Sequence, residues 1–259
     1  MFCPNCGQQN ADNAAFCCGC GAPLAQQQNA YQRKPSNPQN AIQSYMKNPV
    51  VAILAALLSV MAIFALIDFF DIIPEFFKSL KYIGRLGFEG VLSLLISFAI
   101  AIFITLSYSF MAVGLWMVFA AGMGNKQFKD KGISFAASGA TLSIVTYIVT
   151  FAYILFFASR LGVPGSLMAG VVIAVLLFVL AYASTRSVFK QLGTGSITSG
   201  AGVAAVIFNG LLFVLMLVGM DNNPIMGNAQ GFAGTCQILL YACLAGLGVV
   251  HTMTANKTK

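Results

Sequence analysis

Two cysteine pairs near the start of the chain have the spacing of a metal site. Each pair has two residues between its cysteines, ten residues separate the pairs, and the four cysteines are Cys3, Cys6, Cys17 and Cys20. Four thiolates close a tetrahedral shell around Zn(II) with bonds of about 2.3 Å and leave no open position for a substrate. The pattern predicts a structural zinc site, with a glycine after each pair where φ turns positive and enough chain between the pairs for a β-hairpin.

The arrangement resembles the short zinc-ribbon domains at the N-termini of many bacterial membrane proteins, which carry two Cys-Pro-x-Cys-Gly knuckles. The resemblance covers residues 1–22 and implies Cys3, Cys6, Cys17 and Cys20 as the zinc ligands. Cys18 stands where the second knuckle usually has proline, so Cys18 is either a substitute ligand for Cys17 or a spare thiol. A disulfide cluster is the alternative, and it is disfavoured because cytosolic thiols stay reduced.

The charges of this cysteine-rich segment indicate which partners it fits. Residues 1–24 contain no Lys or Arg, whereas binding a phosphate backbone requires clustered basic residues. Nucleic acid is therefore disfavoured, and contact with a cytosolic protein or with the chain's own inner loops is favoured. So short a segment cannot bury enough apolar surface to fold alone, so we expect zinc binding and folding to be one event.

The composition of the rest of the chain points to a lipid environment. Of 259 residues, 58% are hydrophobic and 8% are charged, whereas a soluble domain carries about 25% charged residues. Residues 23–47 are rich in Gln, Asn and Pro, a composition that cannot build a core and predicts a flexible linker. Residues 48–252 form the expected membrane domain, with the lipid bilayer as its surroundings, and 253–259 a short tail.

Long stretches without any charged residue mark the expected membrane spans. Each holds the roughly 20 apolar residues that a helix needs to cross a hydrocarbon core of about 30 Å. The pattern predicts an all-α polytopic bundle with spans at 50–68, 91–121, 133–158, 165–186, 200–220 and 230–251. The second span is longer than a bilayer requires, so we expect it to tilt, kink or project.

The loops between these spans predict the orientation of the bundle. Ten of the 14 Lys and Arg residues fall on the side of both termini, and four fall on the other side. The excess of basic residues in cytoplasmic loops predicts a cytoplasmic (inner) membrane protein with both termini in the cytosol. On the outer side, Lys78, Lys81 and Arg85 recur at helical steps over 74–87. They predict an interfacial helix that caps the bundle, with headgroup contact or a specific ligand as alternatives.

Small and polar residues inside the spans are the remaining candidates for function. A stripe at steps of four along the second span contains Ser93, Ser97, Thr105 and Ser109. Such a stripe indicates close helix packing, with a polar translocation path as the alternative. Two amides, Asn209 and Gln237, lie at similar depth in the last two spans. We expect a hydrogen bond between them to lock the helices, with substrate contact as the alternative.

The predicted spans lack the residue types that ion-coupled pumps and hydrolases use. No charged side chain lies in the interior of a predicted span, which disfavours an ion-coupled pump. Ser196 and His251 are a weak candidate for a hydrolase pair, because no acidic residue accompanies the histidine. The membrane part is loosely similar in connectivity to the Yip-type multi-helix proteins. The sequence thus favours a non-enzymatic membrane protein with a zinc-binding interaction or regulatory module; a small-solute or lipid transporter or channel regulated by the ribbon is the alternative.

Overall fold

The structure is a computed structural model of the chain, and it separates into two units. It describes residues 2–3, 5–11, 14–22, 38–161, 164–219 and 232–258. The first unit is Met1–Asn37 and the second is Pro38–Lys259.

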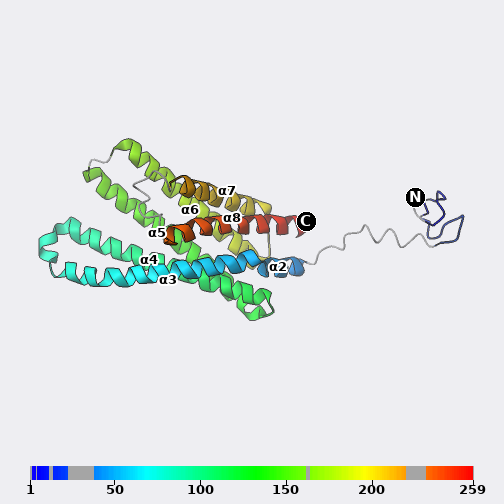
Figure 1. Cartoon of the computed structure of the whole chain (residues 1–259), viewed down its shortest axis with the longest axis horizontal. Helices are drawn as coiled ribbons and strands as arrows, with labels where there is room; N and C mark the ends of the chain where they lie inside the picture. The colour runs from blue at the N-terminus through cyan, green and yellow to red at the C-terminus, as the bar shows by residue number, and fades with distance from the viewer. Residues whose placement is uncertain are drawn as a thin grey trace. The chain divides into compact units, whose positions relative to one another are not determined.

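The second unit is a bundle of long helices (Figure 1). Its elements are α2 (Pro38–Met46), α3 (Pro49–Leu80), α4 (Ile83–Gly122), the short 3-10 turn η1 (Lys126–Phe128), α5 (Lys129–Leu161), α6 (Gly165–Thr194), α7 (Ser199–Gly219) and α8 (Phe232–Thr258). Within the described residues, six helices, α3 to α8, are long and apolar enough to cross a membrane. The predicted helical fold with six long apolar helices is confirmed.

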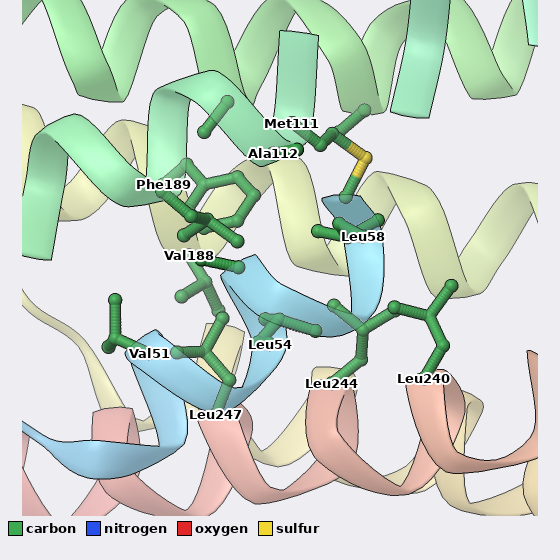
Figure 2. Close-up of a cluster of buried hydrophobic side chains, with 14 of the residues drawn as sticks. Val51, Leu54, Leu58, Met111, Ala112, Val188, Phe189, Leu240, Leu244 and Leu247 are labelled. Carbon is green, nitrogen blue, oxygen red and sulfur yellow. The ribbon is translucent and has the colours of Figure 1, made fainter. Parts of the chain in front are cut away.

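Consecutive helices in this unit pack against each other, and α8 returns to pack against α3 as well as α7 (Figure 1). One part of the core consists of aliphatic rows on α3 and α8 that face each other (Figure 2). The row on α3 contains Val51, Leu54 and Leu58, and the row on α8 contains Leu240, Leu244 and Leu247. All six side chains are buried, so the first and the last long helices are joined by apolar packing.

The α3–α4 hairpin differs from the sequence prediction. The separate interfacial helix expected over 74–87 is not formed, because residues 74–80 continue α3 and α4 begins at Ile83. Aromatic contacts across the hairpin explain the difference: the Phe76 ring stacks on Phe98 of α4 at 4.2 Å, and Phe69 lies 5.6 Å from the same ring. Phe69 and Phe76 lie on either side of Pro74, through which α3 continues as a helix.

Helices α3 and α4 are therefore longer than a bilayer requires. The 32 residues of α3 correspond to about 48 Å at 1.5 Å per residue. Helix α4 is interrupted near its start at Gly87, where φ is 63° and the backbone is not helical. Asp68, the last residue of the first predicted span, lies within the long helical segment Ile42–Leu80, and its side chain is exposed.

The segment before α3 also differs from its prediction as a linker. Residues 38–46 of the expected linker 23–47 form α2, whereas 23–37 lie outside the described residues. The side chains of Ile42, Tyr45 and Met46 are buried, and their spacing places them on one face of the helix. The Tyr45 ring meets the His251 ring of α8 edge-on at 5.8 Å. Apolar packing therefore orders a segment whose polar composition had suggested a coil.

Helices α4 and α5 approach each other through small residues. Gly139 of α5 faces α4 so closely that an added Cβ would lie 2.7 Å from both the Met111 nitrogen and the Ser107 carbonyl oxygen. Ala136 and Ala140 of α5 are fully buried in the same region. Small side chains let two helix backbones come together in this way, which agrees with the predicted packing role of small residues in these spans.

Candidate metal centre

The cysteine-rich segment forms two knuckles with the same backbone hydrogen bonds. In the first knuckle the Cys3 amide donates to the Gln8 carbonyl at 2.9 Å, and in the second the Cys17 amide donates to the Ala22 carbonyl at 2.8 Å. The repeat in sequence is thus a repeat in structure.

A glycine closes each knuckle. The Gly7 amide donates to the Cys3 carbonyl at 2.8 Å and the Gly21 amide to the Cys17 carbonyl at 2.9 Å. The φ angles of these glycines are 73° and 70°, in the left-handed region that a side chain disfavours. The prediction of positive φ after each cysteine pair is confirmed.

The two knuckles bring four sulfur atoms together. The Sγ atoms of Cys3, Cys6, Cys17 and Cys20 all lie within 4.8 Å of one another. The Cys3–Cys20 pair is separated by 3.6 Å and the Cys6–Cys17 pair by 3.4 Å. A tetrahedral site with Zn–S bonds of about 2.3 Å needs sulfur atoms about 3.8 Å apart. The donor set and its size therefore suit a zinc ion with four thiolate ligands.

Backbone amides point at the sulfurs and favour the thiolate form that a metal requires. The Cys20 amide is the main cause that lowers the pKa of the Cys17 thiol to about 6, and the Ala22 amide lowers the pKa of Cys20. The Gln8 amide acts on Cys6 in the same direction, but hydrogen bonds with the Cys20 and Cys17 sulfurs raise the pKa of Cys6 to about 12. Without a cation, the clustered thiols cannot all ionise together.

Cys18 takes no part in this cluster. Its side chain is exposed, and its sulfur lies 4.0 Å from the Gln9 carbonyl oxygen. The alternative ligand of the sequence analysis therefore points away from the other sulfurs, and Cys17 occupies the ligand position. All of the cysteines described, including Cys18, are free thiols.

Asn10 joins the two knuckles, and sequence reasoning missed it. Its Nδ2 donates to the Gln8 carbonyl at 2.7 Å, and its Oδ1 accepts from the Cys18 amide at 2.7 Å. The same Nδ2 lies 3.5 Å from the Cys17 sulfur. The side chain is buried, and no spacing rule distinguishes it from the other amides nearby. Asn10 thus supports the ligands through hydrogen bonds that outer-shell residues commonly provide.

Replacing Asn10 with alanine should weaken zinc binding by about tenfold, because losing an outer-shell partner typically lowers metal affinity 10- to 100-fold. The measurement is a competition titration of the purified protein with a zinc chelator. Gln9→Ala is the matched control, since the Gln9 side chain is exposed. Equal zinc affinity in Asn10→Ala and Gln9→Ala would contradict the positioning role of Asn10.

The predicted β-hairpin is not seen in the described part of residues 2–22. That part contains isolated bridge residues, among them the antiparallel pair Phe2 and Gln9, and no named strand. In the two knuckles the backbone amides donate to nearby carbonyls and sulfurs. Few amides are therefore left for hydrogen bonds between two strands.

The comparison with known families agrees with this geometry. Residues 2–24 match the family model of a zinc-ribbon domain. The matched residues lie within the first unit and extend two residues beyond the predicted range 1–22. No curated protein and no solved structure matches the chain.

The polar stripe on α4 makes contacts between helices. Ser93 forms a 2.8 Å hydrogen bond with the Tyr153 hydroxyl of α5, and Thr105 donates to the Ala65 carbonyl of α3 at 3.1 Å. Ser109 donates to the Thr105 carbonyl of its own helix at 2.7 Å. Ser97 lines a cavity between the helices. The stripe thus packs α4 against α3 and α5, and Ser97 faces the cavity.

The direct hydrogen bond predicted between Asn209 and Gln237 is not formed in the described residues. Nδ2 of Asn209 donates to Thr185 Oγ1 of α6 at 3.3 Å and to the Ala205 carbonyl of its own helix at 2.9 Å. Gln237 of α8 lies instead in the wall of the cavity. Helix α7 packs on both α6 and α8, and the Asn209 side chain reaches toward α6. The interhelical bond of Asn209 therefore joins α7 to α6.

The basic residues of the α3–α4 hairpin make weak local contacts. Lys78 pairs with Glu75 at 3.6 Å, with both side chains exposed, a type of contact that contributes little stability. Arg85 lies over the Tyr82 ring at 5.9 Å. Lys81 caps the end of α3. Such local contacts are typical of an exposed helix end.

The weak hydrolase candidate is not assembled in the described residues. His251 is buried, and its Nε2 shares a 3.0 Å hydrogen bond with Gln191 Oε1. Its Nδ1 has no partner among the described residues. Ser196 is exposed, and its amide lies 3.5 Å from Thr194 Oγ1. A nucleophile and its base need a hydrogen bond between them, and this geometry provides none.

Proposed function

We propose that the chain is a non-enzymatic bacterial membrane protein whose zinc ribbon binds a protein on the cytosolic side of the cytoplasmic membrane. The observation that carries this proposal is a pair of exposed aromatic residues on the ribbon. Phe2 is 67% exposed and Phe16 is 65% exposed. Each directly precedes the first cysteine of a knuckle, so the repeat presents the same apolar side chain twice.

The chemistry of the ribbon favours a protein partner over other partners. Exposed aromatic side chains are typical anchors of protein interfaces. A nucleic acid would require basic residues, and residues 1–24 contain none. A substrate would require an open metal position, whereas four cysteines surround this site.

The proposed cytosolic side rests on two physical arguments. Ten of the 14 basic residues lie on the side of the termini under the six-span topology, which is the cytosolic side in most membrane proteins. Free thiols that bind zinc also persist in a reducing compartment. A ribbon in this place can contact either a soluble protein or the inner loops of its own bundle.

A photo-crosslinking phenylalanine analogue at position 2 or 16 of the full-length protein tests the proposal in cells. We expect both positions to give the same discrete protein adduct, and we expect Cys17→Ser to abolish it because the ribbon then loses its metal. The same analogue at Phe88, which is 78% exposed in the helical unit, is the control and should not give this adduct.

Two results would contradict an interaction role for the ribbon. One is the absence of any discrete adduct from positions 2 and 16. The other is an adduct that persists unchanged in the Cys17→Ser variant. A crosslink to the chain's own segment 126–131 would support the regulatory form of the proposal. Selective solute flux through proteoliposomes that changes when residues 1–24 are removed would instead favour the transporter regulated by the ribbon.

A further inference from the structure

A cavity of about 590 Å³ lies among the six long helices, and each of α3 to α8 contributes to its wall. It is roughly four times larger than the engineered cavity of about 150 Å³ that holds benzene in a protein core. Close-packed interiors normally contain few voids larger than a water molecule. The volume lies within the range of sites that hold drug-sized ligands. The bundle therefore has room for a small organic molecule.

The cavity wall is rich in aromatic rings. The rings come from four helices and belong to Phe64, Phe69, Tyr108, Tyr147 and Tyr182. The faces of aromatic rings attract cations, and clusters of rings commonly recognise quaternary ammonium groups. The same rings offer apolar surface to the body of a ligand.

One charged side chain lines the cavity, and it is the carboxylate of Asp68. The described residues place no basic side chain within ion-pair distance of Asp68. The Asp68 side chain is exposed, and a carboxylate attracts a cation and repels an anion near it. The uncompensated negative charge therefore favours a positively charged occupant.

The deeper polar groups of the wall offer acceptors. Ser107 and Ser143 are buried and hydrogen-bond to each other, and Ser107 also lies 3.0 Å from the Gly139 carbonyl. Thr146 donates to the Leu142 carbonyl at 2.8 Å. These bonds use the hydroxyl protons and leave oxygen lone pairs for a ligand. Gln237 and the tyrosine hydroxyls of the same wall carry donors as well, so the charge of the favoured ligand is set by Asp68.

We propose that this cavity binds a hydrophobic organic cation, whose positive charge pairs with Asp68 and whose apolar body packs on the aromatic rings. The ligand class follows from the negative charge, the acceptor oxygens and the ring faces that share one cavity. The inference concerns binding in the helical unit, and it holds whether or not the ribbon binds a protein.

The probes for the test are tetraphenylphosphonium and tetraphenylborate, which have nearly the same shape and opposite charge. Equilibrium dialysis against the full-length protein in zwitterionic nanodiscs gives the affinity of each ion, with empty nanodiscs correcting for lipid partitioning. We expect saturable binding of tetraphenylphosphonium, at least tenfold tighter than that of tetraphenylborate. Asp68→Asn should weaken binding of the cation at least tenfold, and Asp71→Asn, one turn further along the same helix, should leave it within twofold.

A second pair of variants tests the location without changing any charge. Ala101 lines the cavity, so Ala101→Phe should fill it and abolish saturable binding of the cation. Ala183 is exposed on α6 and does not line the cavity, so Ala183→Phe should bind as the native protein does. Melting temperatures in the same nanodiscs show that each variant is folded. Equal affinity for the two ions, no saturable binding of the cation, or native affinity in Asp68→Asn would overturn the proposal.

Discussion

Replacing Cys17 with serine should remove zinc from the protein and unfold the ribbon. We expect about one zinc per chain in the native protein and close to none in the variant. Structural zinc contributes about 10 kcal/mol or more to the folding of such small modules, and Cys17 lies in the four-sulfur cluster. The measurement is the metal content of the purified full-length protein by elemental analysis.

The neighbouring cysteine provides a matched control for this result. Cys18→Ser removes a thiol one residue away that points out of the cluster, and it should retain one zinc per chain. The opposite outcome, with zinc kept in Cys17→Ser and lost in Cys18→Ser, would show that Cys18 is the ligand. Full zinc content in both single variants, and in the double variant, would contradict the site.

Replacing Gly139 with alanine should destabilise the helical unit by about 1–3 kcal/mol, the usual cost of overpacking a filled interface. The added Cβ would meet backbone atoms of α4 at 2.7 Å, and backbone cannot move aside as a flexible side chain does. Helices α4 and α5 must then separate along their seam. The measurement is the midpoint of thermal unfolding in detergent.

Gly170 on α6 is the control for the same chemical change. An added Cβ there would meet no atom within 4 Å, and alanine favours a helix interior over glycine by about 1 kcal/mol. Gly170→Ala should therefore keep or raise the unfolding midpoint. If Gly139→Ala and Gly170→Ala shifted the midpoint equally, the close approach of α4 and α5 would not be a source of stability.

The sequence predicted the features that depend on local pattern. Cysteine spacing identified the four sulfurs, because two residues between cysteines suffice to turn both toward one ion. Gaps between charges identified six apolar helices, because a charged side chain is costly in lipid. The helix ends were less accurate: α3 extends to Leu80, since the contacts of Phe69 and Phe76 with α4 lie outside any local rule.

The features that sequence reasoning missed depend on contacts between distant segments. Helix α2 is ordered by the burial of Tyr45 beside His251, although its polar composition suggested a linker. Asn10 is important only because the two knuckles meet around it. The cavity arises where six helices fail to fill the space between them. Asp68 lines that cavity, whereas the sequence showed it only as the last residue of a predicted span.

Labelling of Cys18 with a membrane-impermeant maleimide tests most directly whether the ribbon is a zinc-closed module in the cytosol. Cys18 is an exposed thiol outside the four-sulfur cluster. We expect no ribbon label in intact spheroplasts, one label at Cys18 after permeabilisation, and labels at all five ribbon cysteines after zinc is chelated. A label in intact spheroplasts would place the ribbon outside the cell. Five labels without a chelator would show that no metal closes the site.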